Sequence, residues 1–218
     1  MLLYIIRHGD PDYEHNTITP YGHEEAKALA RWFDTHQIHF DAIYTSPLGR
    51  AKDTASYTCQ SQGITPLVLE WTEESMDYMQ PFTPASAISY RFTSQGIEDY
   101  VDFSTEDRMR SINSLVERSD AFLADLGYQR NGSHYNVNNH NDKRIAVFCH
   151  GGMGTAWTAH LLGLPATLGF PSMFMTTTSI NVFEFRPYGD NQSYTRPRML
   201  RFGDISHLHD VGFADDRI

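Results

Sequence analysis

The chain has 218 residues, with 27 acidic and 17 basic side chains, 11 histidines and a formal net charge of -10. Such an acidic surface repels phosphate backbones, so neither nucleic acid nor an anionic membrane is expected as a partner. Hydrophobic residues make up 40% of the chain and charged residues 20%, which is typical of an ordinary globular protein and excludes global disorder. With no internal repeat and no low-complexity linker, a single domain over residues 1–218 is predicted.

The two cysteines, Cys59 and Cys149, are too few for a disulfide framework and lack the paired spacing of a zinc site. They suit a reducing compartment. No apolar run approaches the length that spans a membrane, and the first residues lack the basic region of a signal peptide. A cytoplasmic location is therefore predicted.

Short β-branched runs alternate with longer helical patterns along the chain. This alternation predicts an α/β fold, a three-layer sandwich in which a mostly parallel central sheet carries helices on both faces. Strands are expected over residues 2–6, 41–45, 64–69, 144–149, 179–185 and 195–202. One helix should begin with Thr19 as N-cap and Pro20 behind it, and a second should be capped by Ser46. Two further helices are expected over residues 106–126 and 153–162.

Two segments have no clean periodicity. Residues 75–105 contain aromatic residues, prolines, Met76 and Met79, and we expect a partly helical, lid-like excursion that can cover a site. Residues 131–142 are rich in asparagine and are predicted to form a polar loop.

Three short runs carry side chains that packing alone does not explain. Residues 7–9 (Arg-His-Gly) and 150–152 (His-Gly-Gly) each follow an apolar strand, and open α/β sheets bind ligands at the carboxyl ends of their strands. In residues 46–50 (Ser-Pro-Leu-Gly-Arg), the arginine lies near a helix start, where the helix dipole disfavours a cation unless an anion binds there. Taken alone, residues 7–9 fit a turn better than a site, and Arg50 fits a solvated arginine paired with Asp53 equally well. Together they predict a concave cationic pocket suited to a phosphoryl group.

The order of these runs resembles the histidine phosphatase superfamily, which includes the cofactor-dependent phosphoglycerate mutases. The resemblance extends over nearly the whole chain. It rests on residues 7–9, 18–22 (Ile-Thr-Pro-Tyr-Gly), 45–51 (Thr-Ser-Pro-Leu-Gly-Arg-Ala), 150–152, 179–180 (Ser-Ile) and 206–208 (Ser-His-Leu).

The resemblance implies phosphoryl transfer through a covalent phosphohistidine on His8. Arg7, Arg50 and His150 would hold the phosphoryl oxygens and offset their charge, with Gly151 beside them. Neither a metal ion nor a cofactor is implied, because the cationic side chains take the role that magnesium has in other phosphoryl-transfer sites. The expected ligand is a small phosphorylated metabolite.

A carboxylic acid must also protonate the leaving oxygen, and the resemblance puts this acid shortly after the third strand. The candidates are Glu70, Glu73 and Glu74. Glu73 is the first choice, because residues 71–73 (Trp-Thr-Glu) look like the family's apolar-any-Glu step, and Glu74 is the second.

The sequence favours a phosphatase over a mutase. Residues 10–16 are acidic where mutases carry a small hydroxyl residue and a Trp-Asn pair, and the variable region has no paired arginines to clamp phosphoglycerate. Phosphoglycerate mutase-type transfer and a non-catalytic phosphate-binding protein remain the alternatives. The substrate and the oligomeric state are left open, with a dimer as one candidate.

The 11 histidines also suggest a metal site as an alternative. His8, Asp10 and His150 with His207 or His209 could surround zinc or manganese. The two arginines of the motifs would repel the cation, so a metal is not expected.

Overall fold

A computed structural model of the chain describes residues 1–75, 91–93, 96–98, 106–164, 172–188 and 193–211. The excursion predicted for residues 75–105 therefore lies almost wholly outside the described residues. Within it only residue 75 and the backbone of one short hairpin are described. That hairpin pairs β6 (Arg91–Thr93) with β7 (Gly96–Glu98).

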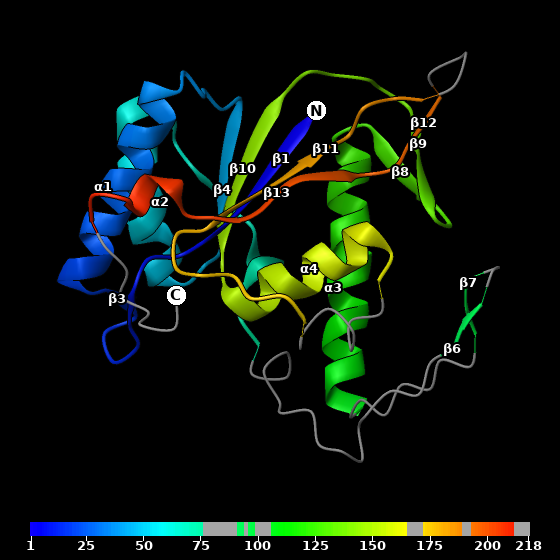
Figure 1. Cartoon of the computed structure of the whole chain (residues 1–218), viewed down its shortest axis with the longest axis horizontal. Coiled ribbons are helices and arrows are strands. Elements are labelled where there is room, and N and C mark those ends of the chain that lie inside the picture. Colours follow the sequence, from blue (N-terminus) through cyan, green and yellow to red (C-terminus); the bar gives the residue numbers. More distant parts are fainter. Residues whose placement is uncertain (76–90, 94–95, 99–105, 165–171, 189–192, 212–218) are drawn as a thin grey trace.

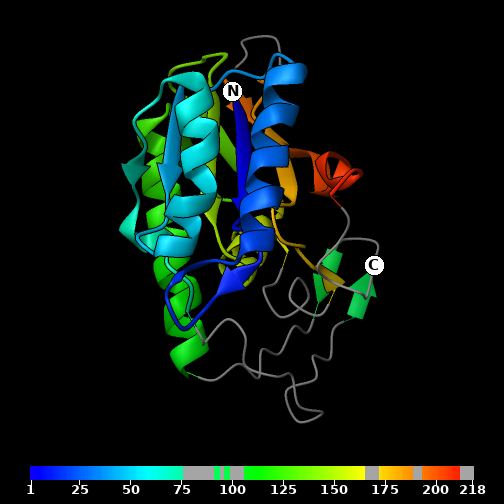
Figure 2. The same cartoon turned by 90° about the vertical axis from the view of Figure 1, so that its left-hand side faces the viewer.

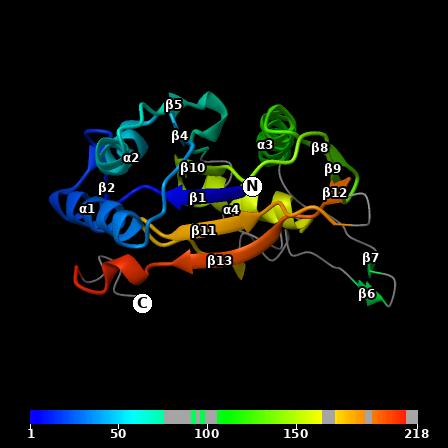
Figure 3. The same ribbon diagram turned by 90° about the horizontal axis from the view of Figure 1, so that it is seen from above.

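Six strands form the central sheet, in the order β13-β11-β1-β10-β4-β5. Adjacent members of the last four run parallel, whereas β11 is antiparallel to β1 and to β13, and Figure 3 shows these three side by side. The strands are β1 (Leu2–Arg7), β4 (Ala42–Thr45), β5 (Leu67–Val68), β10 (Arg144–Cys149), β11 (Ile180–Glu184) and β13 (Arg198–Asp204). The predicted mostly parallel sheet is confirmed.

In the described part of the chain, helices cover both faces of this sheet (Figure 1). Figure 2 looks onto α1 (Pro20–Thr35) and α2 (Gly49–Gln62), which lie side by side on one face. The other face carries α3 (Glu106–Asp125) and α4 (Gly151–Leu162). The three-layer α/β architecture predicted from the sequence is thus confirmed. The smaller elements are β2 (Pro11–Asp12), β3 (Thr17–Ile18), β8 (Tyr128–Asn131), β9 (His134–Val137), β12 (Tyr194–Thr195), η1 (Glu70–Thr72) and η4 (Ser206–Leu208).

Strand β1 is apolar on both sides because both faces of the sheet are covered. Leu3 and Ile5 belong to the core that includes α3 and α4, whereas Tyr4 and Ile6 belong to the core that includes α1 and α2. Burial of a large apolar side chain contributes roughly 1.5–3 kcal/mol, so two cores fix this strand in place. Its carboxyl end, where residues 7–9 follow, is therefore held on a rigid element.

The two predicted helix caps have different outcomes. Thr19 is the N-cap of α1 as predicted, and its hydroxyl accepts a hydrogen bond from the backbone N–H of Gly22 at 3.1 Å. The prediction for Ser46 is wrong, because α2 begins at Gly49 and its N-cap, Leu48, makes no side-chain cap bond. The Ser46 hydroxyl contacts His150 instead, as described below.

The polar loop predicted for residues 131–142 is wrong in part. Strand β9 lies within it and pairs antiparallel with β8 and with β12. Gly132, at a φ of 59°, supplies the left-handed turn that joins β8 to β9. The polar composition therefore reflects a small exposed sheet rather than an irregular loop.

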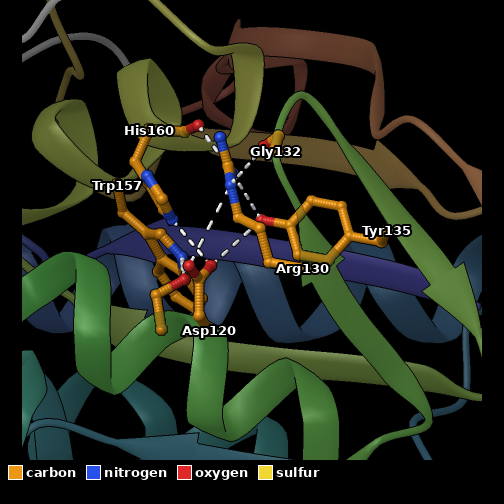
Figure 4. Close-up of polar contacts among 7 residues, drawn as sticks. Asp120, Arg130, Gly132, Tyr135, Trp157 and His160 are labelled. Carbon is orange, nitrogen blue, oxygen red and sulfur yellow. Dashed lines mark hydrogen bonds and ion pairs between the residues drawn. The ribbon is translucent and has the colours of Figure 1, made fainter.

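A partly buried polar cluster ties this hairpin to α3 and α4 (Figure 4). Asp120 of α3 accepts hydrogen bonds from His160 Nε2 at 2.8 Å and from the Tyr135 hydroxyl at 3.3 Å. Arg130 of β8 donates to the Tyr135 hydroxyl at 2.8 Å and to the Gly132 carbonyl at 3.1 Å. We call these residues, Asp120, Arg130, Tyr135 and His160, the hairpin cluster.

No helix among the described residues is long and apolar enough to cross a membrane. The single domain, the cytoplasmic location and the oligomeric state stay predictions.

Candidate active site

The site lies where β1 and β10 end. These strands are parallel neighbours, with Arg7 paired to Cys149, so the residues that follow them emerge side by side. The backbone N–H of His8 donates to the Cys149 carbonyl at 3.0 Å, and the rings of His8 and His150 lie 5.1 Å apart between centroids. Two motifs separated by more than 140 residues thus meet at one edge of the sheet.

His8 is buried, with 2% of its surface exposed, and its tautomer is fixed by its neighbour. Nδ1 lies 2.7 Å from the Gly9 carbonyl, which can only accept, so Nδ1 carries the proton and Nε2 keeps its lone pair. Burial lowers the pKa of His8 to about 3, with the charges of Arg7 and Arg50 acting in the same direction and the Gly9 hydrogen bond opposing them. At neutral pH the imidazole is therefore uncharged and can act as a nucleophile.

His150 caps the start of α4 with extended backbone, and its side chain is fully buried. Nε2 lies 2.7 Å from the Ser46 hydroxyl. Burial, followed by the effect of His8 and the two arginines, lowers the pKa of His150 to about 2. This ring is also neutral, and the Ser46 hydroxyl, which can donate or accept, decides which of its nitrogens carries the proton.

Arg7 is held by the backbone of a distant segment. Its Nη1 donates to the Met175 carbonyl at 2.5 Å, and its guanidinium carbon lies 5.8 Å from the centre of the Phe174 ring. Gly151 leaves room for it, since a Cβ at Gly151 would lie 3.3 Å from Arg7 Nε. The arginine thus passes over the first residue of α4.

Arg50 lies in the first turn of α2, under the loop that precedes β3. Its Nη1 donates to Asn16 Oδ1 at 3.3 Å, and its guanidinium carbon lies 5.4 Å from the centre of the Tyr13 ring. The backbone of this loop packs closely on the helix start, because a Cβ at Gly49 would lie 2.0 Å from the Asn16 carbonyl oxygen. Only glycine fits there.

Arg7, His8 and Arg50 line one cavity of about 710 Å³. Its lining also includes Tyr13, Glu74 and Gly151, whereas His150 is fully buried and is not a lining residue. In the described part of the chain, four buried side-chain nitrogens have no hydrogen-bond partner, and three of them are Arg7 Nε, Arg50 Nε and His150 Nδ1. Neither arginine forms an ion pair with a described carboxylate. The site therefore combines positive charge with hydrogen-bonding capacity that the described residues leave unused.

The three candidate glutamates lie differently. Glu74 lines the cavity, and its two carboxylate oxygens accept the backbone N–H groups of Gly152 and Met153 at 2.9 and 2.8 Å. Burial raises the pKa of Glu74 above its usual value, against the lowering effects of these two bonds and of the arginines. Glu70 and Glu73 are exposed, and neither lines the cavity.

The offset between Glu73 and Glu74 has a local cause. The chain leaves η1 with Glu73 in extended backbone, at φ -62° and ψ 146°. Successive side chains then point to opposite sides, so Thr72 is buried, Glu73 faces solvent and Glu74 faces the cavity. No periodicity in this short segment indicates the offset in advance.

Of the residues that could form a metal site, His8 and His150 are neighbours, but Asp10, His207 and His209 do not join them. Asp10 accepts a hydrogen bond from the Thr19 hydroxyl, His207 contacts Thr178, and His209 is exposed beside Asp210. Among the described residues, no group of three or more histidine, cysteine, aspartate or glutamate side chains is arranged to hold a metal ion.

Two residues of the site were not indicated by the sequence. Ser46 was expected to cap a helix but contacts His150, and Tyr13 lies over Arg50 although it belongs to a loop without an apolar pattern. Both contacts join segments that are distant in the chain, so only the tertiary structure reveals them.

The fold and this site define a three-layer α/β protein with a cationic cavity at the strand ends, and comparisons with known proteins identify its family. The profile of the histidine phosphatase superfamily (branch 1) matches residues 3–194. The chain therefore belongs to the histidine phosphatase superfamily.

Individual relatives are phosphatases. The chain is 28% identical to a broad-specificity phosphatase of Saccharomyces cerevisiae over 166 residues, which are 69% of this chain and 65% of that protein. The chain thus spans somewhat less than two thirds of the length of that relative.

Solved structures share the fold. The phosphoserine phosphatase of Entamoeba histolytica, solved with 3-phosphoglyceric acid, has a TM-score of 0.63 at 22% identity, covering 95% of this chain and 98% of that one. A mycobacterial glucosyl-3-phosphoglycerate phosphatase with inorganic phosphate has a TM-score of 0.62 at 20% identity, covering 94% and 98%.

Proposed function

We propose that this chain is a phosphatase that hydrolyses a small phosphomonoester through a phosphohistidine on His8, without a metal ion. One observation carries the proposal: a neutral His8 with a free Nε2 lies beside buried, unpartnered nitrogens of Arg7, Arg50 and His150. Three donors around a nucleophile match the three equatorial oxygens of a phosphoryl group in transfer. Membership of the family and the phosphatase relatives support the same reaction.

In the first step, His8 Nε2 attacks phosphorus in line with the ester oxygen. The N–P bond forms as the P–O bond to the organic group breaks, and its electron pair leaves with the alkoxide. Arg7 and Arg50 offset the charge of the phosphoryl oxygens. His150 adds a hydrogen bond from Nδ1 when the Ser46 hydroxyl donates to its Nε2.

Glu74 is the proposed general acid, in place of Glu73. It lines the cavity, and its raised pKa favours the protonated form that the leaving alkoxide needs. After that proton is transferred, the carboxylate takes a proton from water as the water attacks the phosphohistidine. The N–P electron pair returns to His8, inorganic phosphate leaves, and Glu74 is protonated again.

The two arginines are the proposed substitute for a metal ion. They place fixed positive charge at the cavity, which is the role that magnesium has in many phosphoryl-transfer sites. Dialysis against EDTA should therefore leave the rate unchanged. A rate that vanishes with EDTA and returns with zinc or manganese would contradict this part of the proposal.

The experiment is a screen of phosphomonoesters with the wild type and His8→Ala, measuring release of inorganic phosphate. The wild type should turn over at least one ester, and His8→Ala should lose about 10³-fold or more of kcat/KM, since it lacks the nucleophile. Conversion of 3-phosphoglycerate to its isomer without net phosphate release would instead indicate a mutase. Binding of phosphate esters with no turnover would indicate a non-catalytic binding protein.

A further inference from the structure

A short segment behind the cavity contacts both residues to which the proposed reaction assigns the largest roles. The Met175 carbonyl accepts from Arg7 Nη1 at 2.5 Å, and the backbone N–H of Thr178 donates to the His8 carbonyl at 3.1 Å. We call residues 175–179 the backing segment. Its position determines where the guanidinium lies relative to the imidazole.

The backing segment has an unfavourable backbone conformation. Thr178 has a φ of 54°, in the left-handed region, where a β-branched residue is rare and strained. Its hydroxyl donates to the Thr177 carbonyl at 2.8 Å and accepts from His207 Nε2 at 2.9 Å. A conformation of this kind persists only where its surroundings hold it.

Glu25 of α1 links this segment to the loop that follows the nucleophile. One of its carboxylate oxygens accepts from the Thr177 hydroxyl at 2.6 Å, and the other accepts from the backbone N–H of Asp10 at 2.6 Å. The side chain has no exposed surface, and no lysine or arginine hydrogen-bonds to it among the described residues. Burial of an unpaired carboxylate is costly and raises the pKa of Glu25.

The start of α1 is also packed tightly against the loop. A Cβ at Gly9 would lie 2.8 Å from the Gly22 carbonyl oxygen, and a Cβ at Gly22 would lie 2.5 Å from the Asp10 carbonyl oxygen. Glu25 stands three residues after Gly22, on the same side of the helix. The carboxylate is therefore presented from a rigid element to both segments, in addition to the backbone bond between Thr178 and His8.

We propose that Glu25 is a positioning residue for the phosphoryl transfer proposed above, acting through the backing segment and the Asp10 loop to fix Arg7 relative to His8. Glu25 does not line the cavity and takes no part in proton transfer. Its effect is geometric. A displacement of about 1 Å between the nucleophile and the charge that stabilises the transition state costs about 10²-fold in rate.

The test compares three variants in the full chain with an ester that the wild type hydrolyses. Glu25→Ala removes both links. Glu25→Gln keeps both, because its amide oxygen accepts from Asp10 and its amide nitrogen donates to the Thr177 hydroxyl, which can rotate. Glu24→Ala is the matched control, since Glu24 is exposed on the same helix and pairs with Lys27.

The readouts are kcat, KM, the melting temperature and inhibition by two probes. Orthovanadate resembles the five-coordinate transition state and depends on the position of His8, whereas inorganic phosphate resembles the ground state. We expect Glu25→Ala to lower kcat about 10- to 100-fold and to weaken inhibition by vanadate by a similar factor. KM and inhibition by phosphate should change less than about threefold. Glu25→Gln should have a kcat within about fivefold of that of the wild type. The control, Glu24→Ala, should have the kcat of the wild type.

Either of two results would overturn the proposal. The first is a folded Glu25→Ala variant with wild-type kcat. The second is a Glu25→Ala variant with lowered kcat in which inhibition by vanadate and inhibition by phosphate are weakened by the same factor. If Glu25→Ala does not fold, Thr177→Val replaces it, because it removes one link at nearly constant volume. That variant should lower kcat about fivefold, and an unchanged kcat refutes the proposal. Absence of turnover in the wild type would refute the proposed function itself, whereas turnover without dependence on Glu25 refutes this inference alone.

Discussion

Two partly buried polar clusters among the described residues contain similar side chains and differ in how those side chains are paired. In the hairpin cluster, Asp120 accepts from His160 and lies 4.0 Å from Arg130, whose other contacts are a hydroxyl and backbone carbonyls. The active-site cluster consists of Arg7, Arg50, His8 and His150, with both histidines neutral. No described carboxylate forms an ion pair with either arginine.

The difference separates a structural role from a binding role. A buried cation normally has a carboxylate partner, because desolvation of an unpaired charge is costly. The hairpin cluster follows this rule and joins β8 and β9 to α3 and α4 (Figure 4). The active site departs from it, and an anionic ligand would supply the missing partner.

The largest effect is expected from the arginines. Arg7→Ala or Arg50→Ala should lower kcat/KM about 10³-fold, because each removes a charge-assisted contact to the phosphoryl oxygens in the transition state. Arg130→Ala, in the hairpin cluster, should keep kcat/KM within about threefold of the wild type while lowering the melting temperature. Steady-state kinetics on the three folded variants makes the comparison, and equal losses of activity in all three would contradict it.

The next effect is expected from the acid. Glu74→Gln should lower kcat about 10²-fold with an alkyl phosphate, whose leaving group needs a proton, whereas Glu73→Gln should leave kcat unchanged. An aryl phosphate, whose leaving group needs little protonation, should show a smaller loss in the first step. A full-rate Glu74→Gln variant beside an impaired Glu73→Gln variant would reverse the assignment of the acid.

The pH profile separates the two groups further. The pKa of His8 is about 3, so the imidazole stays unprotonated, and able to attack, from pH 7 down to pH 4. Glu74 must be protonated for the first step, so kcat/KM should fall as pH rises through its raised pKa, by about tenfold per unit for a single group. Glu74→Gln should flatten this alkaline limb. An alkaline limb that persists unchanged in Glu74→Gln belongs to another group.

In the hairpin cluster, the effect should appear in stability. Asp120→Ala leaves His160 and Arg130 without their carboxylate partner, and it should reduce the free energy of unfolding by about 1–3 kcal/mol. Because no residue of this cluster lines the cavity, kcat should stay within about twofold of the wild type. Urea unfolding measured beside kinetics tests both halves, and a variant with wild-type stability would show that the cluster contributes nothing.

The smallest effect is expected from ligand binding. Inorganic phosphate at ten times its dissociation constant should stabilise the wild type by about 1.4 kcal/mol, and Asp120→Ala should retain this gain. Arg50→Ala should lose most of it, because the partner of the anion is gone. Thermal unfolding with and without phosphate gives the comparison, with sulfate as a second probe anion.

The strands and helices that the sequence predicted well are those with strong local patterns. Residues 145–149 are apolar throughout because both faces of β10 are buried, and Thr19-Pro20 marks the start of α1 with a capping hydroxyl. The hairpin at residues 128–137 was missed because its polar, asparagine-rich strands have one exposed side and little apolar alternation.

The sequence predicted those residues of the candidate site that directly follow a predicted strand or begin a predicted helix. His8, His150 and Arg50 follow elements with clear patterns, so their convergence was expected. Glu74 and the two links of Glu25 depend on a single turn and on contacts between distant segments, which no local pattern encodes.

The most direct test of the central claim is detection of the covalent intermediate. The wild type, mixed with an ester labelled in its phosphate and quenched within one turnover, should carry acid-labile, base-stable phosphate that mass spectrometry assigns to His8. His8→Ala should carry none. Full hydrolysis by the wild type with no label on His8, together with an unchanged rate in His8→Ala, would contradict the account.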